Sequence, residues 1–276
     1  MTTYEIREIW RYPVKSMGGE SIPAAELSTA GVSGDRQWAL RSTDSGKIVS
    51  AKRPRPYGAL LDWSATLTDD GVVVTGPGGA TFEAGAPDLD AAVSSALGEA
   101  VSFAPMVEGA EETYDSEWPE IPGTSLSETE AEFPIAMLTG KASFVDVSAL
   151  HLLVADSMAH LGTLLPDVEL DVRRFRPSMV LGAVDGGHDG FADLAWTDVS
   201  TSIGSVELWI GAPAPRCVMT TLPQGGLERA NGILKALAAH GKHSSDFGTF
   251  ACLGTYAEVT APGTVAVGDR LDITLD

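Results

Sequence analysis

The sequence contains very little cysteine: only Cys217 and Cys252 in a chain of 276 residues. Two thiols cannot build a disulfide scaffold, and they cannot supply the four thiolates of an ordinary iron–sulfur cluster. Each cysteine is therefore open to three interpretations, as buried apolar filler, as a nucleophile or as a metal ligand.

The chain also lacks long apolar runs and a targeting pattern. No run approaches the roughly 18 to 20 residues that a membrane-spanning helix requires. The N-terminus, MTTYEIREIW, does not have the basic, apolar and small-residue order of a secretory signal. Because 44% of the residues are hydrophobic, we expect a soluble globular protein of the cytoplasm with no membrane partner.

Basic residues are scarce and unevenly placed. The chain has 18 Lys and Arg against 38 Asp and Glu, a formal net charge of −20, which argues against nucleic acid and anionic membranes as partners. Half of the cations lie within residues 1–55, whereas residues 56–140 contain none. An acidic protein has thus concentrated its positive charge in its first fifth.

Several short functional motifs are missing as well. The sequence contains no HExxH, GxSxG, P-loop or GxGxxG pattern, so nothing in it indicates a conventional zinc hydrolase or nucleotide-binding enzyme. The HxxH pair, His240 and His243, lies in a polar segment where a solvated turn is the better interpretation.

Alternation of apolar and polar residues dominates what is present and predicts half-buried strands. It occurs over residues 61–67, 206–210 and 271–275, with turn signals between such runs. Helical spacing occurs three times, in the sets Leu89, Val93 and Leu97; Met158, Leu161 and Leu165; and Leu227, Leu234 and Leu237. We therefore expect a mainly β fold with a few short helices.

Residues 108–132 are acidic, rich in turn formers and without either period. Such a segment is typical of a long loop or linker. We expect the boundary between two domains to lie there.

The N-terminal cations include Lys15, Arg36, Lys52, Arg53 and Arg55, all at predicted turns or strand ends. Side chains and backbone amides can converge there on a phosphate or carboxylate. The alternative is that they only solvate exposed loops, and this alternative is favoured for Lys52 and Arg53.

Three further arginines lie within RRFRPSMVLG, at 173–182. Clustered guanidinium groups need an anion to neutralise them. Alternation places Arg174 and Arg176 on one face, and Pro177 favours an extended backbone at Arg176. The alternative is a set of ion pairs with nearby Asp167, Glu169 and Asp171.

The segment PAPRCVMTT, at 213–221, contains Cys217 next to Arg216. A neighbouring cation favours the thiolate, which is both a nucleophile and a soft metal ligand. The alternative is a buried structural cysteine, an interpretation that also fits Cys252 in its apolar strand.

In this order, YPVKS, GDRQW, AKRPRP, RFRPS, PRCVMT, LGTYAEV and PGTVAVGD resemble the MOSC proteins, named for the C-terminal domain of molybdenum cofactor sulfurase. The subgroup they are most similar to is the mitochondrial amidoxime-reducing component and its bacterial relatives. The resemblance implies an N-terminal MOSC-associated β-barrel module over 1–110, an acidic linker over 111–132 and a MOSC β-barrel domain over 133–276.

The resemblance also implies a molybdenum–molybdopterin cofactor. Cys217 matches the metal-ligating cysteine of the family, and Asp146 matches a residue close to the metal. These two are the expected catalytic residues. The residues expected to bind the cofactor are Lys15, Ser16, Arg36, Arg55, Ser148, Arg174, Arg176, Ser178, Arg216 and Tyr256. Ser178 departs from the asparagine usual in the family, so one cofactor contact is expected to differ.

The implied activity is reduction of small N-hydroxylated compounds, with electrons from a separate ferredoxin- or flavin-type protein. Neither an iron–sulfur cluster nor pyridoxal phosphate is expected in this chain. Two alternatives remain open, a non-enzymatic carrier of the cofactor or of sulfur, and a protein that kept the fold but lost the metal site.

Overall fold

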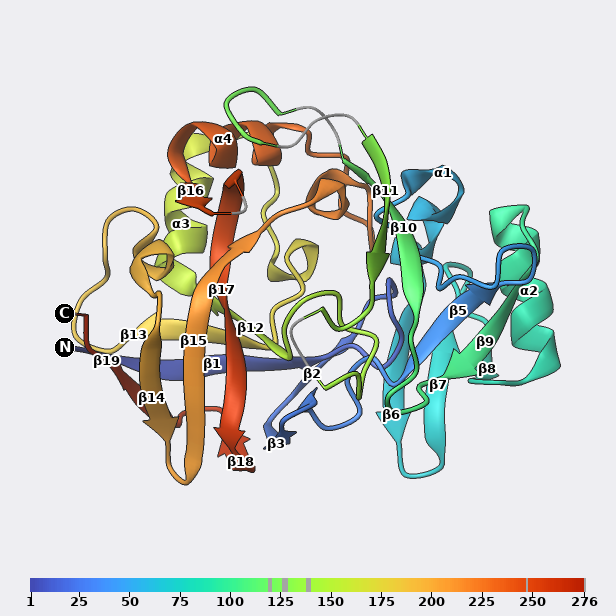
Figure 1. Ribbon diagram of the computed structural model, residues 1–276, viewed down its shortest axis with the longest axis horizontal. Coiled ribbons are helices and arrows are strands. Elements are labelled where there is room, and N and C mark those ends of the chain that lie inside the picture. Colours follow the sequence, from blue (N-terminus) through green and yellow to red (C-terminus); the bar gives the residue numbers. More distant parts are fainter. Residues whose placement is uncertain (119–120, 126–128, 138–139, 247, 276) are drawn as a thin grey trace.

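The polypeptide folds mainly into β-strands, which gather in two halves that lie side by side (Figure 1). The computed structural model describes residues 1–118, 121–125, 129–137, 140–246 and 248–275. The expected fold class, mainly β with a few short helices, is confirmed.

Among the described residues, nine strands form one sheet in the larger half. The main path runs through β14 (Val199–Ile203), β15 (Val206–Pro215), β17 (Gly248–Ala261), β12 (Leu150–Val154), β13 (Met179–Ala183), β1 (Thr2–Arg11) and β19 (Arg270–Ile273), with β16 (Lys242–Ser245) beside β17 and β2 (Glu20–Ile22) beside β1. The hydroxyl of Thr201 on β14 donates to the carbonyl of Asp272 on β19 at 2.8 Å, so the sheet curves back on itself.

The inward faces of these strands carry the predicted alternation. Val206, Leu208 and Ile210 are buried, whereas Glu207 and Trp209 between them are exposed. With Trp196 and similar side chains from the other strands, the inward residues fill one apolar core. The prediction for residues 206–210 is confirmed, and the strand predicted over 271–275 ends at Ile273.

The first strand of the chain belongs to the larger half. β1 pairs antiparallel with both β13 and β19, and the sheet of β3 (Ala24–Ser28), β4 (Gly31–Val32) and β18 (Gly263–Ala266) likewise joins the two ends of the chain. Residues 1–110 therefore do not form one separate half in space, and the domain limits drawn on the sequence stay a prediction.

The smaller half contains short strands, two α-helices and a 3-10 helix around its own apolar core. Its elements are β5 (Trp38–Ser42), α1 (Pro54–Tyr57), η1 (Gly58–Asp62), β6 (Ser64–Thr68), β7 (Gly71–Thr75), β8 (Thr81–Glu83), α2 (Pro87–Leu97) and β9 (Val101–Pro105). The strand predicted over 61–67 is partly wrong, because Leu61 lies in the 3-10 helix η1 and the strand begins only at Ser64.

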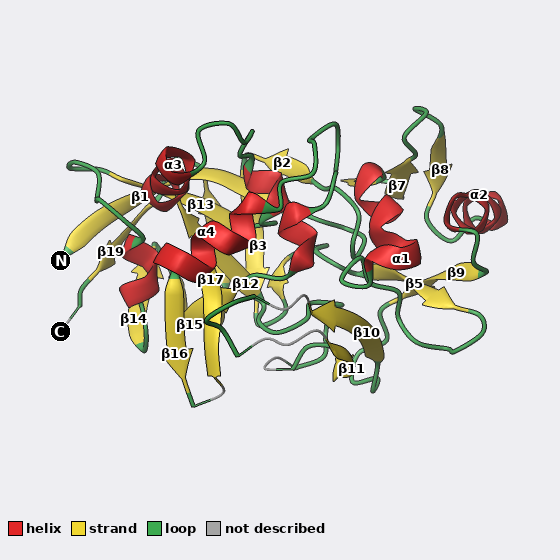
Figure 2. Cartoon of the chain, turned by 90° about the horizontal axis from the view of Figure 1, so that it is seen from above, coloured by secondary structure: helices red, strands yellow, loops and turns green. Residues whose placement is uncertain are grey.

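All three predicted helices are present (Figure 2). α2 ends at Gly98, whose φ of 69° suits glycine, and α3 (Ala155–Leu164) ends shortly before Pro166. α4 (Gly232–His240) is shorter than predicted, since Leu227 precedes it. α3 and α4 pack an apolar layer on the outside of β12 and β17. Within the described part of the chain, no helix has the length and apolar character needed to cross a bilayer.

The acidic segment 108–132 contains regular structure, so the prediction of an irregular loop is wrong. β10 (Thr113–Trp118) and β11 (Thr129–Pro134) pair as an antiparallel hairpin. Acids of this segment pair with cations: Arg41 binds Glu112, just before β10, through two hydrogen bonds of 2.9 and 2.6 Å, and Lys47 lies 2.8 Å from Asp115 and 2.5 Å from Glu132. These ion pairs let a strongly acidic segment adopt a strand conformation.

The close approach of β17 to β12 gives a stability prediction. A Cβ on Gly254 would lie 2.1 Å from His151 Nε2 and 2.6 Å from the Leu152 carbonyl oxygen. We expect Gly254→Ala to lower the free energy of unfolding by roughly 3 kcal/mol in urea titrations, the sum of backbone strain and steric overlap.

Gly268→Ala is the matched control. Gly268 also has a positive φ, 96°, but nothing lies within 4 Å of its Cβ position, so only the strain of about 1 kcal/mol should appear. Equal losses in the two variants would contradict the packing described for Gly254.

Candidate functional site

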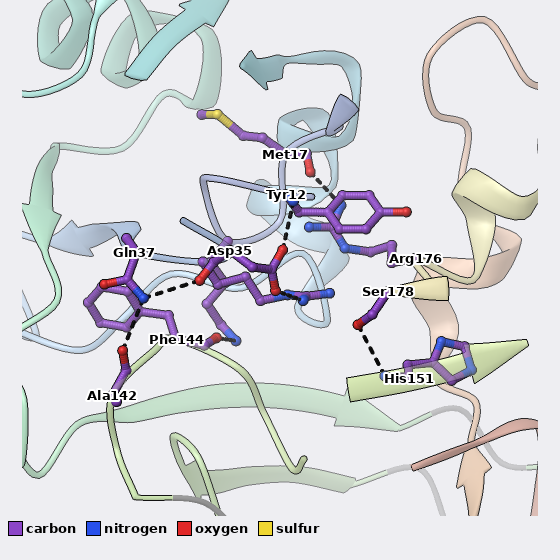
Figure 3. A network of polar contacts seen from close by, with 11 residues as sticks. Tyr12, Met17, Asp35, Gln37, Ala142, Phe144, His151, Arg176 and Ser178 are labelled. Carbon is purple, nitrogen blue, oxygen red and sulfur yellow. Dashed lines mark hydrogen bonds and ion pairs between the residues drawn. The ribbon is translucent and has the colours of Figure 1, made fainter. Parts of the chain in front are cut away.

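Most of the predicted site residues converge where loops from the smaller half meet the larger half. Backbone hydrogen bonds join three segments: Arg36 N–H donates to the Tyr12 carbonyl at 2.8 Å, Lys15 N–H to the Trp38 carbonyl at 2.9 Å, and Phe144 N–H to the Arg36 carbonyl at 2.8 Å. Segments 12–16, 36–38 and 144–146 are thereby held as one layer. Figure 3 shows Tyr12 beside Arg176, and Ser178 beside His151, where this layer meets the larger half.

Three of the predicted residues have an unusual backbone. Ser16, Arg36 and Arg176 have φ values of 66°, 47° and 54°, and they make up half of the non-glycine residues with positive φ in the described ranges. Each such conformation costs on the order of 1 kcal/mol and is typical of functional sites. The expected extended backbone at Arg176 is therefore wrong, although Pro177 follows it.

Lys15 and Lys52 enclose the carboxylate of Asp146. Lys15 Nζ forms an ion pair with Asp146 Oδ1 and donates to the Phe144 carbonyl at 3.0 Å. Lys52 Nζ lies 2.9 Å from Asp146 Oδ2 and donates to the hydroxyl of Tyr114 at 3.0 Å. Lys52 is buried, so the interpretation of this residue as a solvated loop cation is wrong.

The pKa values in this cluster follow from burial and from the ion pairs. Burial lowers the pKa of Lys15 to about 8, although Asp146 opposes the shift. Burial would also lower the pKa of Lys52, but Asp146 and Tyr114 hold it well above its usual value. For Asp146, burial is outweighed by the two ammonium groups, which keep its pKa well below the usual range.

Arg36 and Arg176 lie on the ring of Tyr12, with guanidinium carbons 5.1 and 4.2 Å from the ring centroid. Arg36 is paired with Asp35, whereas the one side-chain hydrogen bond of Arg176 among the described residues goes to the Met17 carbonyl. Burial, followed by repulsion from Arg36, lowers the pKa of Arg176 to about 10.

Arg216 lies beside His151 at the end of β15. Its Nη2 donates to the Phe175 carbonyl at 2.7 Å, and its Nη1 lies 3.2 Å from His151 Nε2. Burial and the Arg216 charge hold the pKa of His151 well below its usual value, so the imidazole is neutral and can accept from Arg216. The Tyr256 ring meets His151 edge to face at 6.2 Å.

Cys217 follows directly and precedes the 3-10 helix η4 (Val218–Thr221). The residue is 9% exposed and packs with Ala51, Leu61 and Trp118. It contributes to raising the pKa values of Lys52 and Tyr256. Across the described residues, no group of three His, Cys, Asp or Glu side chains surrounds a point where a metal could bind.

Three predicted residues are already committed to the fold. Arg174 lies in the 3-10 helix η2 (Val172–Arg174), not in a strand, and donates to three carbonyl groups, those of Glu169, Leu222 and Glu228. Ser148 donates to the Ala257 carbonyl at 2.8 Å, and Ser178 Oγ accepts from His151 N–H at 3.2 Å.

Two further arginines, Arg55 and Arg173, lie outside this set of contacts. Arg55 is exposed on α1, and among the described residues no hydrogen bond or ion pair joins it to the layer described above. Arg173 forms the ion pair with Asp171 that the alternative interpretation of the 173–182 segment predicted, at 2.7 Å.

Sequence reasoning missed Tyr12, Asp35 and His151. None of them carries a distinctive spacing, and a lone tyrosine or histidine in an apolar strand is ordinarily structural. The only available signal was adjacency, since Tyr12 begins YPVKS and Asp35 precedes Arg36.

The assembled layer carries a surplus of positive charge. Five cations, Lys15, Arg36, Lys52, Arg176 and Arg216, face two carboxylates, Asp35 and Asp146. In the described part of the chain, Arg176 Nη2 and Arg216 Nε are buried without a hydrogen-bond partner. Such arginine donors suit an anionic group such as a phosphate. Two hollows on the surface lie apart from this layer, one lined by residues that include Tyr57 and the other by residues that include Thr201.

The double ion pair at Asp146 gives a prediction. Asp146→Asn should lower the free energy of unfolding at pH 7 by roughly 2–3 kcal/mol, because two buried ammonium groups lose their counterion. Since a quarter of the Asp146 side chain is exposed, solvent screens the ion pairs and keeps the loss at this moderate size. The loss should shrink as the pH falls below about 4, where the unfolded wild type takes up the proton.

The control is Asp115→Asn, which removes a more exposed ion pair with Lys47 and should cost less than about 1 kcal/mol. Urea titrations between pH 3 and pH 7 make the comparison. A loss at Asp146 that does not change with pH would contradict the ion pairs.

Comparison with known proteins matches residues 3–112 to the MOSC N-terminal beta barrel domain and residues 139–272 to the MOSC domain. Mitochondrial amidoxime reducing component 2 of Bos taurus is 25% identical over 96% of this chain and 81% of its own length. Mitochondrial amidoxime-reducing component 1 of Homo sapiens is 24% identical with the same coverage.

Among solved structures, the YUAD protein from Bacillus subtilis is 10% identical, covering 98% of this chain and 95% of its own with a TM-score of 0.45. The two domain matches occupy most of the chain in the order expected from its motifs. The chain is a MOSC-domain protein with a MOSC N-terminal β-barrel module.

Proposed function

We propose that this protein binds a molybdenum–molybdopterin cofactor between its two halves. The observation that carries the proposal is the buried surplus of positive charge, with unpaired guanidinium nitrogens on Arg176 and Arg216. In a chain of net charge −20, such a surplus needs a reason. A phosphate-bearing cofactor would neutralise it and pair both nitrogens.

The residues present fit this group. Cys217 would supply one thiolate to the metal, and the cofactor itself would supply the other ligands, in keeping with the absence of a cluster of protein ligands in the described residues. Arg36, Arg176 and Arg216 would hold the anionic part. When bound, the cofactor supplies two-electron redox chemistry, while the chain supplies orientation and electrostatics.

We further propose that the reaction is reduction of a small N-hydroxylated compound. The relatives that are similar over 96% of the chain carry the name amidoxime reducing component. Such a reduction takes two electrons and two protons, breaks the N–O bond and releases water. Lys15, whose pKa is lowered to about 8, is suited to donate one of these protons from its Nζ. Its ion pair with Asp146 would hold the ammonium group in position.

The electrons would come from a separate ferredoxin- or flavin-type protein, and the compartment we propose is the cytoplasm. Two cysteines cannot supply the four thiolates of an ordinary iron–sulfur cluster within this chain, which supports an external donor. Cofactor binding by the purified protein depends neither on the electron donor nor on the compartment.

Metal and pterin analysis tests the proposal. Wild-type protein made in a host that synthesises the cofactor should contain molybdenum and pterin, and Cys217→Ala should lose most of the molybdenum. Cys252→Ala is the matched control and should retain it, because Cys252 is buried with its Sγ on the Phe250 carbonyl. Wild type without molybdenum and pterin would overturn the cofactor proposal.

Turnover separates an enzyme from a carrier. Loaded protein supplied with a chemical reductant, such as a reduced viologen dye, should convert an amidoxime to the amidine. A loaded protein that leaves amidoximes and hydroxylamines unchanged would contradict the reductase and favour a cofactor carrier.

A further inference from the structure

Tyr12 is the first residue after β1 and lies at the centre of the candidate site without being one of its predicted members. Its side chain is 1% exposed. The backbone N–H donates to Asp35 Oδ1 at 2.7 Å, and the carbonyl accepts from Arg36 N–H at 2.8 Å. Both backbone polar groups of Tyr12 are therefore bonded to the turn that contains Asp35 and Arg36.

The ring contacts two cations. The guanidinium carbons of Arg36 and Arg176 lie 5.1 and 4.2 Å from its centroid, and Figure 3 shows the ring against Arg176. Arg36 and Arg176 repel each other, and an aromatic ring in contact with both lessens the cost of keeping two like charges close. The ring is thus a scaffold for a pair of arginines.

The packing fixes the position of this ring. A Cβ on Gly19 would lie 2.6 Å from Tyr12 Cδ1 and 2.2 Å from the Arg11 carbonyl oxygen. The backbone at residue 19 therefore passes so close to the ring that only glycine fits. On another side, Trp10 stacks on Tyr12 with ring centroids 6.2 Å apart.

The hydroxyl of Tyr12 is the unexplained part. It is buried, and within the described residues it has no hydrogen-bond partner, the same condition as Nη2 of the adjoining Arg176. Two unsatisfied buried donors on side chains in contact are rare, because burial removes water from both. A ligand oxygen that accepts from both would resolve them together.

We propose that Tyr12 binds and positions the anionic ligand, its hydroxyl donating to the same phosphate-like group as Arg176 Nη2 while its ring holds Arg36 and Arg176 in place. The inference rests on the proposed cofactor site and adds a specific residue to it. It assigns two tasks to Tyr12, one to the ring and one to the hydroxyl, which different substitutions separate.

The test uses Tyr12→Phe and Tyr12→Leu in the full chain, each made in a host that synthesises the cofactor and in one that does not. Tyr4→Phe is the matched control, a buried tyrosine in the core beside Trp196. The readouts are the rate at which molybdenum and pterin are lost on dialysis and the melting temperature of each form.

Without cofactor, Tyr12→Phe should melt at or above the wild-type temperature, because the hydroxyl has no partner among the described residues. With cofactor, it should lose pterin about tenfold faster and gain less thermal stability on loading. Tyr12→Leu should lose pterin faster still, since the arginines lose their ring. Tyr4→Phe should retain pterin like the wild type.

Cofactor-free Tyr12→Phe that melts well below the wild type, or fails to fold, would make the hydroxyl a structural group and overturn the inference. Loaded Tyr12→Phe that keeps pterin as well as the wild type would overturn it too. Wild type that contains no pterin would instead overturn the cofactor proposal, so the two failures are distinguishable.

Discussion

Uncompensated positive charge between the two halves is the constraint around which this protein is arranged. Five cations meet two carboxylates in a layer assembled from both halves, within a chain of net charge −20. Asp146 neutralises much of the charge of Lys15 and Lys52, and Asp35 that of Arg36. Among the described residues, Arg176 and Arg216 each keep one buried nitrogen without a hydrogen-bond partner, and the proposed anionic cofactor would pair both.

The fold could be predicted where local pattern decides it. Strand alternation at 206–210 and helical spacing at 89–97 each reflect one buried face, so the sequence alone predicts β15 and α2. The hairpin formed by β10 and β11 could not be predicted in this way, because its acids Asp115 and Glu132 pair with Lys47, a cation far away in the chain. The pairing of β1 with β13 and β19 also depends on contacts between distant segments.

The site was predictable in its residue types rather than in its geometry. Motif resemblance marked Lys15, Arg36, Arg176, Arg216 and Cys217, which the structure brings together. Alternation predicted that the side chains of Arg174 and Arg176 lie on one face of a strand. Arg174 instead lies in a 3-10 helix and Arg176 has a left-handed backbone, so the two side chains have different partners. Tyr12 and His151 acquire their significance only from the arginines that the fold sets against them.

Anomalous X-ray scattering at the molybdenum absorption edge, on crystals of protein loaded in a cofactor-competent host, tests the central claim most directly. The account predicts a single molybdenum peak bonded to Cys217 Sγ, with phosphate density on Arg176 between the two halves. A metal peak away from Cys217, or an anion bound elsewhere while the Arg176 and Arg216 nitrogens stay unpaired, would contradict it.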